Sequence, residues 1–273
     1  PDVDLISLTG GIDAGRSLVH GAAGNMKKIA MELGGKSPNI VFADADFETA
    51  VDNALTAAFT HSGQVCSAGA RAIVEDAIYD RFVAELGRRA DAIHLGHGRD
   101  DATEAGALIS AEHRAKVEAH VADALADGAR LVAGGRRPDE PELQAGFFYR
   151  PTVFADVHPG MRIVREEVFG PVLTVERFTT EEEAIALAND TEYGLAGAVW
   201  TSDGSRAQRV AARIRAGTVW INDYNTYLPQ AEWGGFKRSG IGRELGPSGL
   251  AEYREAKHIW QNTAPGPSGW FRG

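Results

Sequence analysis

The stretch from Lys27 to Gly63, KKIAMELGGKSPNIVFADADFETAVDNALTAAFTHSG, carries the clearest alternation of secondary structure in the chain. An apolar run at 27–33 predicts a strand, and two glycines followed by a proline predict a turn after it. Residues 39–42 form a second short apolar run. From 46 to 61, apolar side chains recur at the i, i+3, i+4, i+7 spacing of an amphipathic helix. Strand, turn, strand and helix in succession predict an α/β fold.

The same alternation continues on both sides of this stretch. Asp44 or Asp46 is placed to cap the helix at 46–61, and Thr180 to Glu183 form a capping-box pattern in front of a later helix. Because strands and helices alternate, at least part of the sheet is predicted to be parallel. The other predicted strands are 3–8, 70–75, 129–133, 148–154, 171–178, 195–201 and 217–222, and the other predicted helices are 13–23, 77–93, 111–127, 181–189 and 204–214.

Composition argues against several classes of partner. The 273 residues include 28 Lys and Arg against 38 Asp and Glu, a formal net charge of −10, and no basic run could follow a phosphate backbone or an anionic bilayer. No uninterrupted apolar run approaches the ~18 residues of a membrane helix. We therefore expect no nucleic-acid or membrane partner, and no metal site is predicted. The single cysteine, Cys66, cannot form an intramolecular disulfide, which favours a reducing compartment, the cytoplasm by default.

Cys66 and Glu32 are the candidate reactive groups. Cys66 lies just beyond the helix in a glycine-bounded turn, where a side chain can point into a cleft, although a lone cysteine is more often a buried small hydrophobe. Glu32 ends an apolar strand, so partial desolvation is expected to raise its pKa toward the range of a general base. The alternatives are a helix cap or a surface ion pair. Gly34 and Gly35 lack Cβ atoms, so a flat ring or a phosphate could approach them closely.

Four blocks in this order carry a resemblance to a known family: MELGGKSP at 31–38, GQVC at 63–66, EEVFGP at 166–171 and the segment from Trp233 to Gly246. Together they resemble the C-terminal, catalytic part of the NAD(P)-dependent aldehyde dehydrogenase superfamily, and the similarity extends over residues 2 to 260. The interval between Glu32 and Cys66 is also similar to that of the family. The resemblance implies an α/β aldehyde dehydrogenase-like catalytic domain, the last part of a Rossmann-like coenzyme domain and a C-terminal oligomerisation strand.

The resemblance also implies a mechanism. Cys66, as thiolate, would attack the aldehyde carbon, and the resulting thiohemiacetal would pass a hydride to the nicotinamide and leave a thioester. Glu32 would activate the water that hydrolyses the thioester, and the backbone N–H of Cys66 would help to hold the oxyanion. Glu244 matches a family carboxylate near the base and is a candidate proton relay. An ion pair of Glu244 with Arg243 or Lys237 is the alternative.

The expected cofactor is NAD, with NADP as the alternative. Glu167 matches the family position that hydrogen-bonds the nicotinamide ribose, and Phe169 the position that packs near the ring. Leu33 and Gly34 complete this part of the expected site. The turn that contains Gly10, Gly11 and Gly15 corresponds to the block that grips the pyrophosphate at a helix N-terminus. Family members commonly carry a serine where this chain has Gly11, so one hydroxyl contact is absent.

The segment from 222 to 235 predicts the substrate site. Tyr227 and Trp233 correspond to family residues that line the aldehyde tunnel, and Asn225 lies between them and the preceding strand. Two aromatic faces could enclose a quaternary ammonium group by cation–π attraction. The segment most resembles betaine-aldehyde and aminoaldehyde dehydrogenases, so the expected substrate is a cationic aldehyde. A generic aromatic tunnel for apolar aldehydes is the alternative, and Thr60 stands where many such enzymes carry an aromatic residue.

The resemblance divides the chain into residues 1–33, the end of a coenzyme domain whose upstream part is absent, then 34–238, the catalytic domain, 239–262, a return segment with an oligomerisation strand, and 263–273, a flexible tail. Residues 252–260 resemble the strand by which family subunits pair, which implies a homodimer or homotetramer. Two other functional interpretations stay open: a truncated, non-catalytic relative, and a residual esterase that uses Cys66 and Glu32 without a cofactor.

Overall fold

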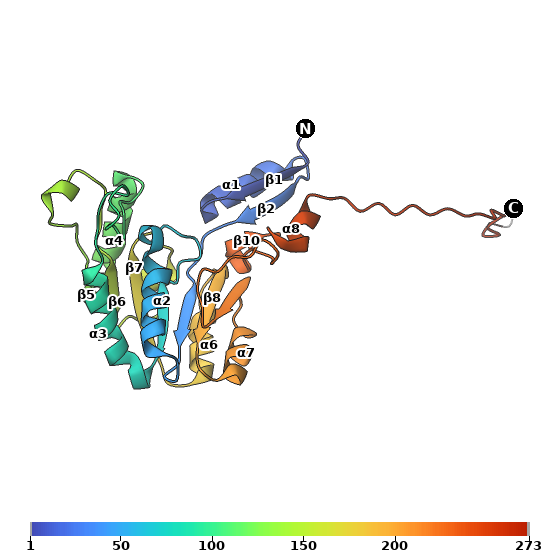
Figure 1. Cartoon of the computed structure of the whole chain (residues 1–273). Coiled ribbons are helices and arrows are strands. Elements are labelled where there is room, and N and C mark those ends of the chain that lie inside the picture. The colour runs from blue at the N-terminus through green and yellow to red at the C-terminus, as the bar shows by residue number, and fades with distance from the viewer. Residues whose placement is uncertain (1, 272–273) are drawn as a thin grey trace.

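The computed structural model describes residues 2–271, which fold into two sheets (Figure 1). The smaller sheet has the order β1-β2-β10 and is made of β1 (Leu5–Thr9), β2 (Lys28–Glu32) and β10 (Gly240–Ile241). β1 and β2 are parallel and are joined by helix α1 (Ile12–Ala23), whereas β10 runs antiparallel to β2. The βαβ unit expected at the start of the chain is therefore present.

The larger sheet has seven strands in the order β5-β6-β7-β4-β3-β8-β9. All neighbours are parallel except β5 and β6, which confirms the prediction of an α/β fold with a parallel sheet. The strands are β3 (Pro38–Val41), β4 (Arg71–Glu75), β5 (Arg130–Ala133), β6 (Thr152–Ala155), β7 (Val172–Phe178), β8 (Ala196–Trp200) and β9 (Thr218–Ile221).

Helices cover both faces of the larger sheet because its central strands are apolar on both sides. Val41 and Val74 pack with α2 (Phe47–Phe59) and α3 (Asp76–Ala92), whereas Ile40 and Ile73 pack with α6 (Glu181–Asn189) and α7 (Gly204–Ala211). Figure 1 shows the two helix pairs on opposite sides of the strands. The remaining helical elements are α4 (Ala111–Ala126), α5 (Arg162–Arg165), α8 (Gly246–Glu252) and the 3-10 turns η1 (Thr60–Gly63), η2 (Pro141–Leu143) and η3 (Lys237–Ser239).

Two predicted helix caps can be compared with the structure. Asp46, and not Asp44, caps α2 by accepting from the backbone N–H of Thr49 at 2.9 Å. The hydroxyl of Thr180 accepts from the backbone N–H of Glu183 at 3.2 Å, so the first half of the capping box is confirmed. The second half is shifted by one residue, since the Glu183 carboxylate accepts from the backbone N–H of Thr179.

Two predicted strands differ from the structure. The strand predicted at 148–154 begins only at Thr152, because Pro151 has no N–H to give to a ladder. The pairing strand that residues 252–260 resemble is not formed within the single chain, where Glu252 ends α8 and residues 254–271 have no helix or strand, and pairing between subunits stays a prediction. A strand forms only by hydrogen bonding to a neighbouring strand. Residues 254 and 255 instead contact the rest of the chain through Lys28, whose ammonium group binds the carbonyl of Arg254 and the carboxylate of Glu255.

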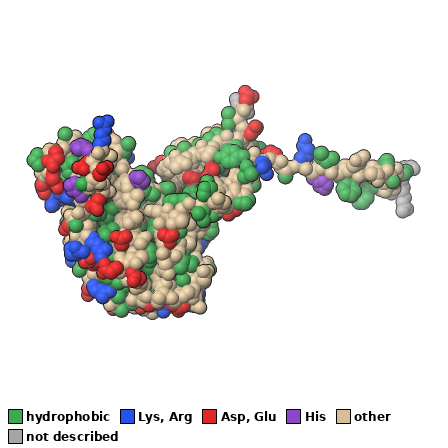
Figure 2. All heavy atoms as spheres, viewed as in Figure 1, with side chains coloured by type: hydrophobic (Ala, Val, Ile, Leu, Met, Phe, Trp, Pro, Cys, Tyr) green, Lys and Arg blue, Asp and Glu red, His purple; other side chains and the backbone are tan. Residues whose placement is uncertain are grey.

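After α8 the chain leads away from the body as an extended stretch (Figure 1). Ile259 and Trp260 on this stretch are 80% and 82% exposed. The expected tail at 263–273 falls partly here, and its residues 272–273 lie outside the described part of the chain. Figure 2 shows acidic and basic side chains intermixed on the visible face of the body. Within residues 2–271, no helix is long and apolar enough to cross a membrane.

Gly63, at the end of η1, is held in a left-handed conformation with φ of 70°. A Cβ atom there would lie 2.1 Å from the carbonyl oxygen of Gly170. We expect Gly63→Ala to lower the free energy of unfolding by ~3 kcal/mol or more, measured by urea denaturation, because backbone strain and a steric clash add. Gly128 is the matched control: its φ is 89°, but nothing lies within 4 Å of the added Cβ, so Gly128→Ala should cost only ~1–2 kcal/mol. Equal losses would show that the contact with Gly170 imposes no constraint.

Candidate active site

The candidate residues meet where the two sheets face each other. Glu32 is the last residue of β2, at the carboxyl end of the small parallel pair. Cys66 precedes β4, and Glu167 precedes β7, so both lie at the amino ends of strands in the larger sheet. The site therefore combines the carboxyl edge of one parallel sheet with the amino edge of another.

Glu32 is held by backbone ladders on both sides, since it pairs with Thr9 of β1 and with Gly240 of β10. Its side chain is 8% exposed, and the Oε2 atom has no hydrogen-bond partner. Burial, followed by the negative charge of Glu244, raises the pKa of Glu32 from 4.5 to about 7, against the opposing effects of Trp233 and Arg243. The expected desolvation is confirmed, and the helix-cap and ion-pair alternatives for Glu32 are wrong within residues 2–271.

A strained turn carries Cys66 into the site. His61, Ser62 and Gly63 have consecutive φ values of 51°, 56° and 70°, and the Ser62 hydroxyl anchors the turn by donating to the Gly106 carbonyl at 2.7 Å. Cys66 is half-buried. Burial, together with the negative charges of Glu167 and Glu32, raises the pKa of its thiol. A raised pKa disfavours the thiolate, so forming the thiolate expected from the sequence calls for a nearby proton acceptor.

The two glycines after Glu32 permit close approach of protein groups. A Cβ at Gly35 would lie 2.5 Å from the Cys66 carbonyl oxygen, and a Cβ at Gly34 would lie 2.1 Å from Glu167 Oε2. The backbone N–H of Gly35 donates to Glu167 Oε1 at 3.0 Å. The space predicted for a ring or a phosphate is thus occupied by Glu167 and the Cys66 turn, which pack against the two glycines.

Glu167 and its surroundings form a buried charged region. Burial raises the pKa of Glu167, while the Gly35 N–H and the charge of Lys36 lower it. Lys36 is itself fully buried, its ammonium group has no hydrogen-bond partner, and burial lowers its pKa to about 7. Phe169 has a φ of 55°, and its carbonyl lies 2.6 Å from His113 Nε2. Sequence reasoning missed both residues: Lys36 lies within the MELGGKSP block but was given no role there, and His113 lies in no pattern that distinguishes it from surface charge.

The residues expected at the pyrophosphate are placed at the start of α1. Gly11 is the N-cap residue of α1, has no side-chain cap, and has open space where a Cβ would lie. The backbone N–H of Gly10 donates to the Glu32 carbonyl at 3.0 Å, so this turn adjoins the base. Gly15 lies within the helix, where a Cβ would lie 2.7 Å from Leu33. The packing of α1 against Leu33 therefore explains why position 15 is a glycine. Gly15 and Leu33 both line an open hollow of about 220 Å³.

The aromatic residues expected at the substrate are clustered. The ring centroids of Tyr227 and Trp233 are 4.9 Å apart, and Trp220 is within 6.3 Å of both. The three line a hollow of about 340 Å³ together with the carboxylate residues Asp223 and Glu232. This arrangement places negative charge beside aromatic rings, which suits a cationic group.

Glu244 is tied to both the aromatic segment and the small sheet. Its backbone exchanges two hydrogen bonds of 2.7 Å with Trp233, and its carboxylate accepts from the Ser7 hydroxyl at 3.1 Å. Within residues 2–271 it forms no ion pair with Arg243 or Lys237, so that alternative is wrong. Its position beside Glu32 is compatible with the relay role, which stays a prediction.

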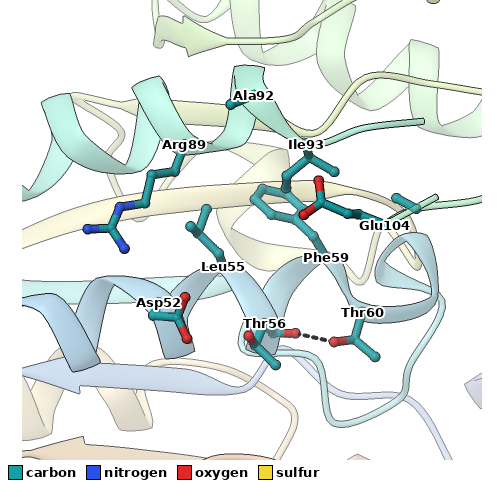
Figure 3. Close-up of a pocket in the computed structure, with 10 residues that line it drawn as sticks. Asp52, Leu55, Thr56, Phe59, Thr60, Arg89, Ala92, Ile93 and Glu104 are labelled. Carbon is teal, nitrogen blue, oxygen red and sulfur yellow. Dashed lines mark hydrogen bonds between the residues drawn. The ribbon is translucent and has the colours of Figure 1, made fainter. Parts of the chain in front are cut away.

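A separate open pocket of about 350 Å³ lies between α2 and α3 and contains none of the predicted site residues (Figure 3). Asp52, Thr56 and Thr60 line it, and the Thr60 hydroxyl donates to the Thr56 carbonyl at 2.7 Å. Thr60, at the position where many such enzymes were expected to carry an aromatic residue, therefore contributes a hydroxyl group to this pocket. Among residues 2–271, no group of three or more His, Cys, Asp or Glu side chains is arranged to hold a metal ion.

Comparison with known proteins gives consistent results. Residues 1–259 match the model described as the aldehyde dehydrogenase family. A betaine aldehyde dehydrogenase of Bacillus subtilis is 63% identical over 99% of this chain and 55% of its own length, and one of Rhizobium leguminosarum is 46% identical over 97% and 54%. A betaine aldehyde dehydrogenase of Staphylococcus aureus, solved in complex with NAD+, superposes with a TM-score of 0.97 and 55% identity over 99% of this chain and 54% of that one. The chain spans about half the length of the relatives it matches.

Proposed function

The chain belongs to the aldehyde dehydrogenase family, and from that premise we propose that it is the catalytic part of an enzyme that oxidises an aldehyde to a carboxylic acid with NAD. NADP is the alternative cofactor. One observation carries the proposal: the carboxyl group of Glu32, with a pKa of about 7, lies beside a turn that presents the only thiol of the chain. A carboxylate that titrates near neutral pH can both accept and release a proton.

The residues around Cys66 fit the expected cofactor. The first turn of α1 has backbone N–H groups without intrahelical partners, and Gly11 leaves room in front of them, which suits a pyrophosphate. Glu167 offers a half-buried carboxylate near the Cys66 turn, which suits ribose hydroxyls, and Phe169, two residues later, is 39% exposed. When bound, NAD would accept a hydride from the carbon joined to the Cys66 sulfur.

The chain's own groups supply the remaining steps. Glu32 takes the thiol proton of Cys66, and the thiolate adds to the aldehyde carbon while the backbone N–H of Cys66 holds the carbonyl oxygen. After oxidation the carbon is attached to Cys66 as a thioester. Glu32, again ionised, takes a proton from water as the water attacks, the carboxylic acid leaves, and the thiol is restored. Glu244 is in place to pass the proton from Glu32 onward.

We assign betaine aldehyde or an ω-aminoaldehyde as the substrate. The relatives and solved structures named above are betaine aldehyde dehydrogenases. The hollow beside Tyr227 and Trp233 combines aromatic rings with the carboxylates of Asp223 and Glu232, and each cation–π contact contributes ~0.5–2 kcal/mol. A generic apolar tunnel would not need the two carboxylates.

The test compares aldehydes of different charge. The chain, and a version extended at its N-terminus, would be mixed with NAD and either betaine aldehyde or hexanal while reduced cofactor is followed. We expect betaine aldehyde to give the higher kcat/KM by tenfold or more, since cation–π contacts with two rings and the attraction of two carboxylates together exceed about 1.4 kcal/mol. Equal efficiency with hexanal would overturn the substrate assignment. No NAD-dependent turnover by either version, with ester hydrolysis intact, would favour the esterase interpretation.

Assembly, location and domain boundaries complete the proposal. The exposed Ile259 and Trp260, on a stretch without its own strand partner, support pairing with a second copy in a homodimer or homotetramer. The single cysteine supports a reducing, cytoplasmic location. We divide the chain into the parts 1–33, 34–238, 239–262 and 263–273. The small sheet supports this division, because β10 of the third part returns to pair with β2 of the first part.

A further inference from the structure

Ser67, the residue after the nucleophile, joins the Cys66 turn to the aromatic segment. Its side chain is fully buried, and its hydroxyl donates to Asn225 Oδ1 at 3.1 Å. The Tyr227 phenol oxygen lies 2.5 Å from the same hydroxyl. The Ser67 carbonyl, in turn, accepts from the Tyr224 phenol at 2.8 Å. The hydroxyl and the carbonyl of Ser67 are therefore both hydrogen-bonded to the segment that carries the aromatic residues of the predicted substrate site.

The three side chains form a closed set of contacts. Asn225 Oδ1 can only accept, and both hydroxyls reach it, Ser67 at 3.1 Å and Tyr227 at 3.3 Å, while either hydroxyl can donate in the 2.5 Å contact between them. Asn225 has a φ of 59°, a conformation that an asparagine adopts at a small cost when its side chain is bonded. Tyr227, Ser67 and Asn225 thus form a hydrogen-bonded triangle, in which the contact between the two hydroxyls is the shortest.

The Tyr227 ring is otherwise weakly fixed. It is 45% exposed and makes edge contacts with Trp233 at 4.9 Å and Trp220 at 5.9 Å, and its phenol also donates to Asn225 Oδ1 at 3.3 Å. Removing the Ser67 hydroxyl would take away the shorter hydrogen bond at the phenol, and the ring would be held less firmly. Cation–π attraction depends on the ring face being held within about 6 Å of the cation, so rotation would weaken it.

We propose that Ser67 is a specificity-determining positioning residue, whose hydroxyl holds the Tyr227 ring so that a cationic aldehyde is selected over a neutral one of the same shape. The inference rests on the proposed function, because it assigns how that substrate preference is built. It also places the recognition of the charged end one residue from the sulfur that reacts at the other end. The Tyr227 ring is thereby connected, through the Ser67 side chain, to the turn that carries the sulfur.

The experiment uses unreactive probes of matched shape. Choline and 3,3-dimethylbutan-1-ol differ in having nitrogen or carbon at the branched centre, and neither reacts with Cys66. Their dissociation constants would be measured by quenching of tryptophan fluorescence, to which Trp220 and Trp233 contribute at the hollow. In the wild-type chain we expect choline to bind ~10-fold or more tightly than the neutral alcohol.

Ser67→Ala should weaken choline binding ~3- to 10-fold and leave the neutral alcohol within twofold, since only the cation needs the ring face. Ser67→Thr, which keeps a hydroxyl, should retain most of the preference. Tyr227→Phe removes both hydrogen bonds of the phenol, so it should weaken choline binding at least as much as Ser67→Ala, and adding Ser67→Ala to it should have no further effect. Melting temperatures close to wild type would accompany these results.

Three outcomes would overturn the inference. Equal weakening of both probes by Ser67→Ala would show a purely structural role for the hydroxyl. An unchanged preference in Ser67→Ala, with the wild type selective, would overturn the role of Ser67 and leave the proposed substrate standing. A wild-type chain that binds both probes equally would overturn this inference and the assignment of a cationic substrate together. The oxidation of aldehydes by Cys66 is tested independently, by the Cys66→Ala variant.

Discussion

Cys66→Ala is expected to lower kcat/KM for aldehyde oxidation by ~10⁴-fold or more, because the step that forms the thiohemiacetal loses its nucleophile. Ester hydrolysis should fall in parallel, since acyl transfer uses the same sulfur. Cys66 is the only cysteine of the chain, so no neighbouring thiol can substitute. Mass spectrometry after mixing with 4-nitrophenyl acetate should show one acetyl group on the wild-type chain and none on the variant.

Cys66→Ser provides the matched control. A serine hydroxyl has nearly the same size but is a far weaker nucleophile at neutral pH, so the variant should fold like wild type and have almost no activity. Substantial turnover in Cys66→Ala, or an acetyl group attached elsewhere with hydrolysis intact, would contradict the assignment of Cys66. The raised pKa of the thiol adds a second expectation, that acetylation accelerates as the pH rises above neutrality.

Glu32→Gln is expected to slow thioester hydrolysis by ~10²–10⁴-fold, because the amide cannot take a proton from water. Acylation should be less affected at alkaline pH, where solvent can deprotonate the thiol of Cys66. The acyl-enzyme should therefore accumulate and be visible as a burst of 4-nitrophenol followed by a slow steady state. Glu182→Gln, at an exposed position of α6, is the control and should behave like wild type.

The pH dependence gives an independent check on Glu32. Its pKa is about 7, and only the carboxylate form acts as a base. Wild-type hydrolysis should thus be slow below about pH 6, rise through pH 7 and level off above pH 8. Glu32→Gln should lack this rise. A wild-type profile that is flat from pH 5 to 8 would show that the buried carboxyl group of Glu32 is not the base.

The local parts of the fold were predictable because each depends on nearby residues. Helix α2 follows from apolar spacing and the Asp46 cap, and the central strands follow from short apolar runs. The raised pKa of Glu32 was predictable from its place at the end of an apolar strand. α8 was missed because its first residues include Gly246 and Pro247, which are more typical of a turn.

Contacts between distant segments were not predictable from the chain alone. The pairing of β10 with β2 gives Glu32 its second backbone neighbour, yet a two-residue strand has no periodic pattern. The contact of Glu167 with Gly34 and Gly35 depends on where β7 lies relative to β3. Ser67 carries no signal except that it follows Cys66. These residues are identified only when the two sheets and the aromatic segment are placed in space.

The location of the site between two sheets has a mechanical consequence. Glu32 is fixed by the ladders of the small sheet, and Cys66 by a turn of the large one, so the gap between base and nucleophile depends on how the two sheets are held together. The chain crosses between the sheets at residues 33–37 and again between β9 and β10. A substitution in either crossing is therefore expected to alter the reaction rate without touching a reactive side chain.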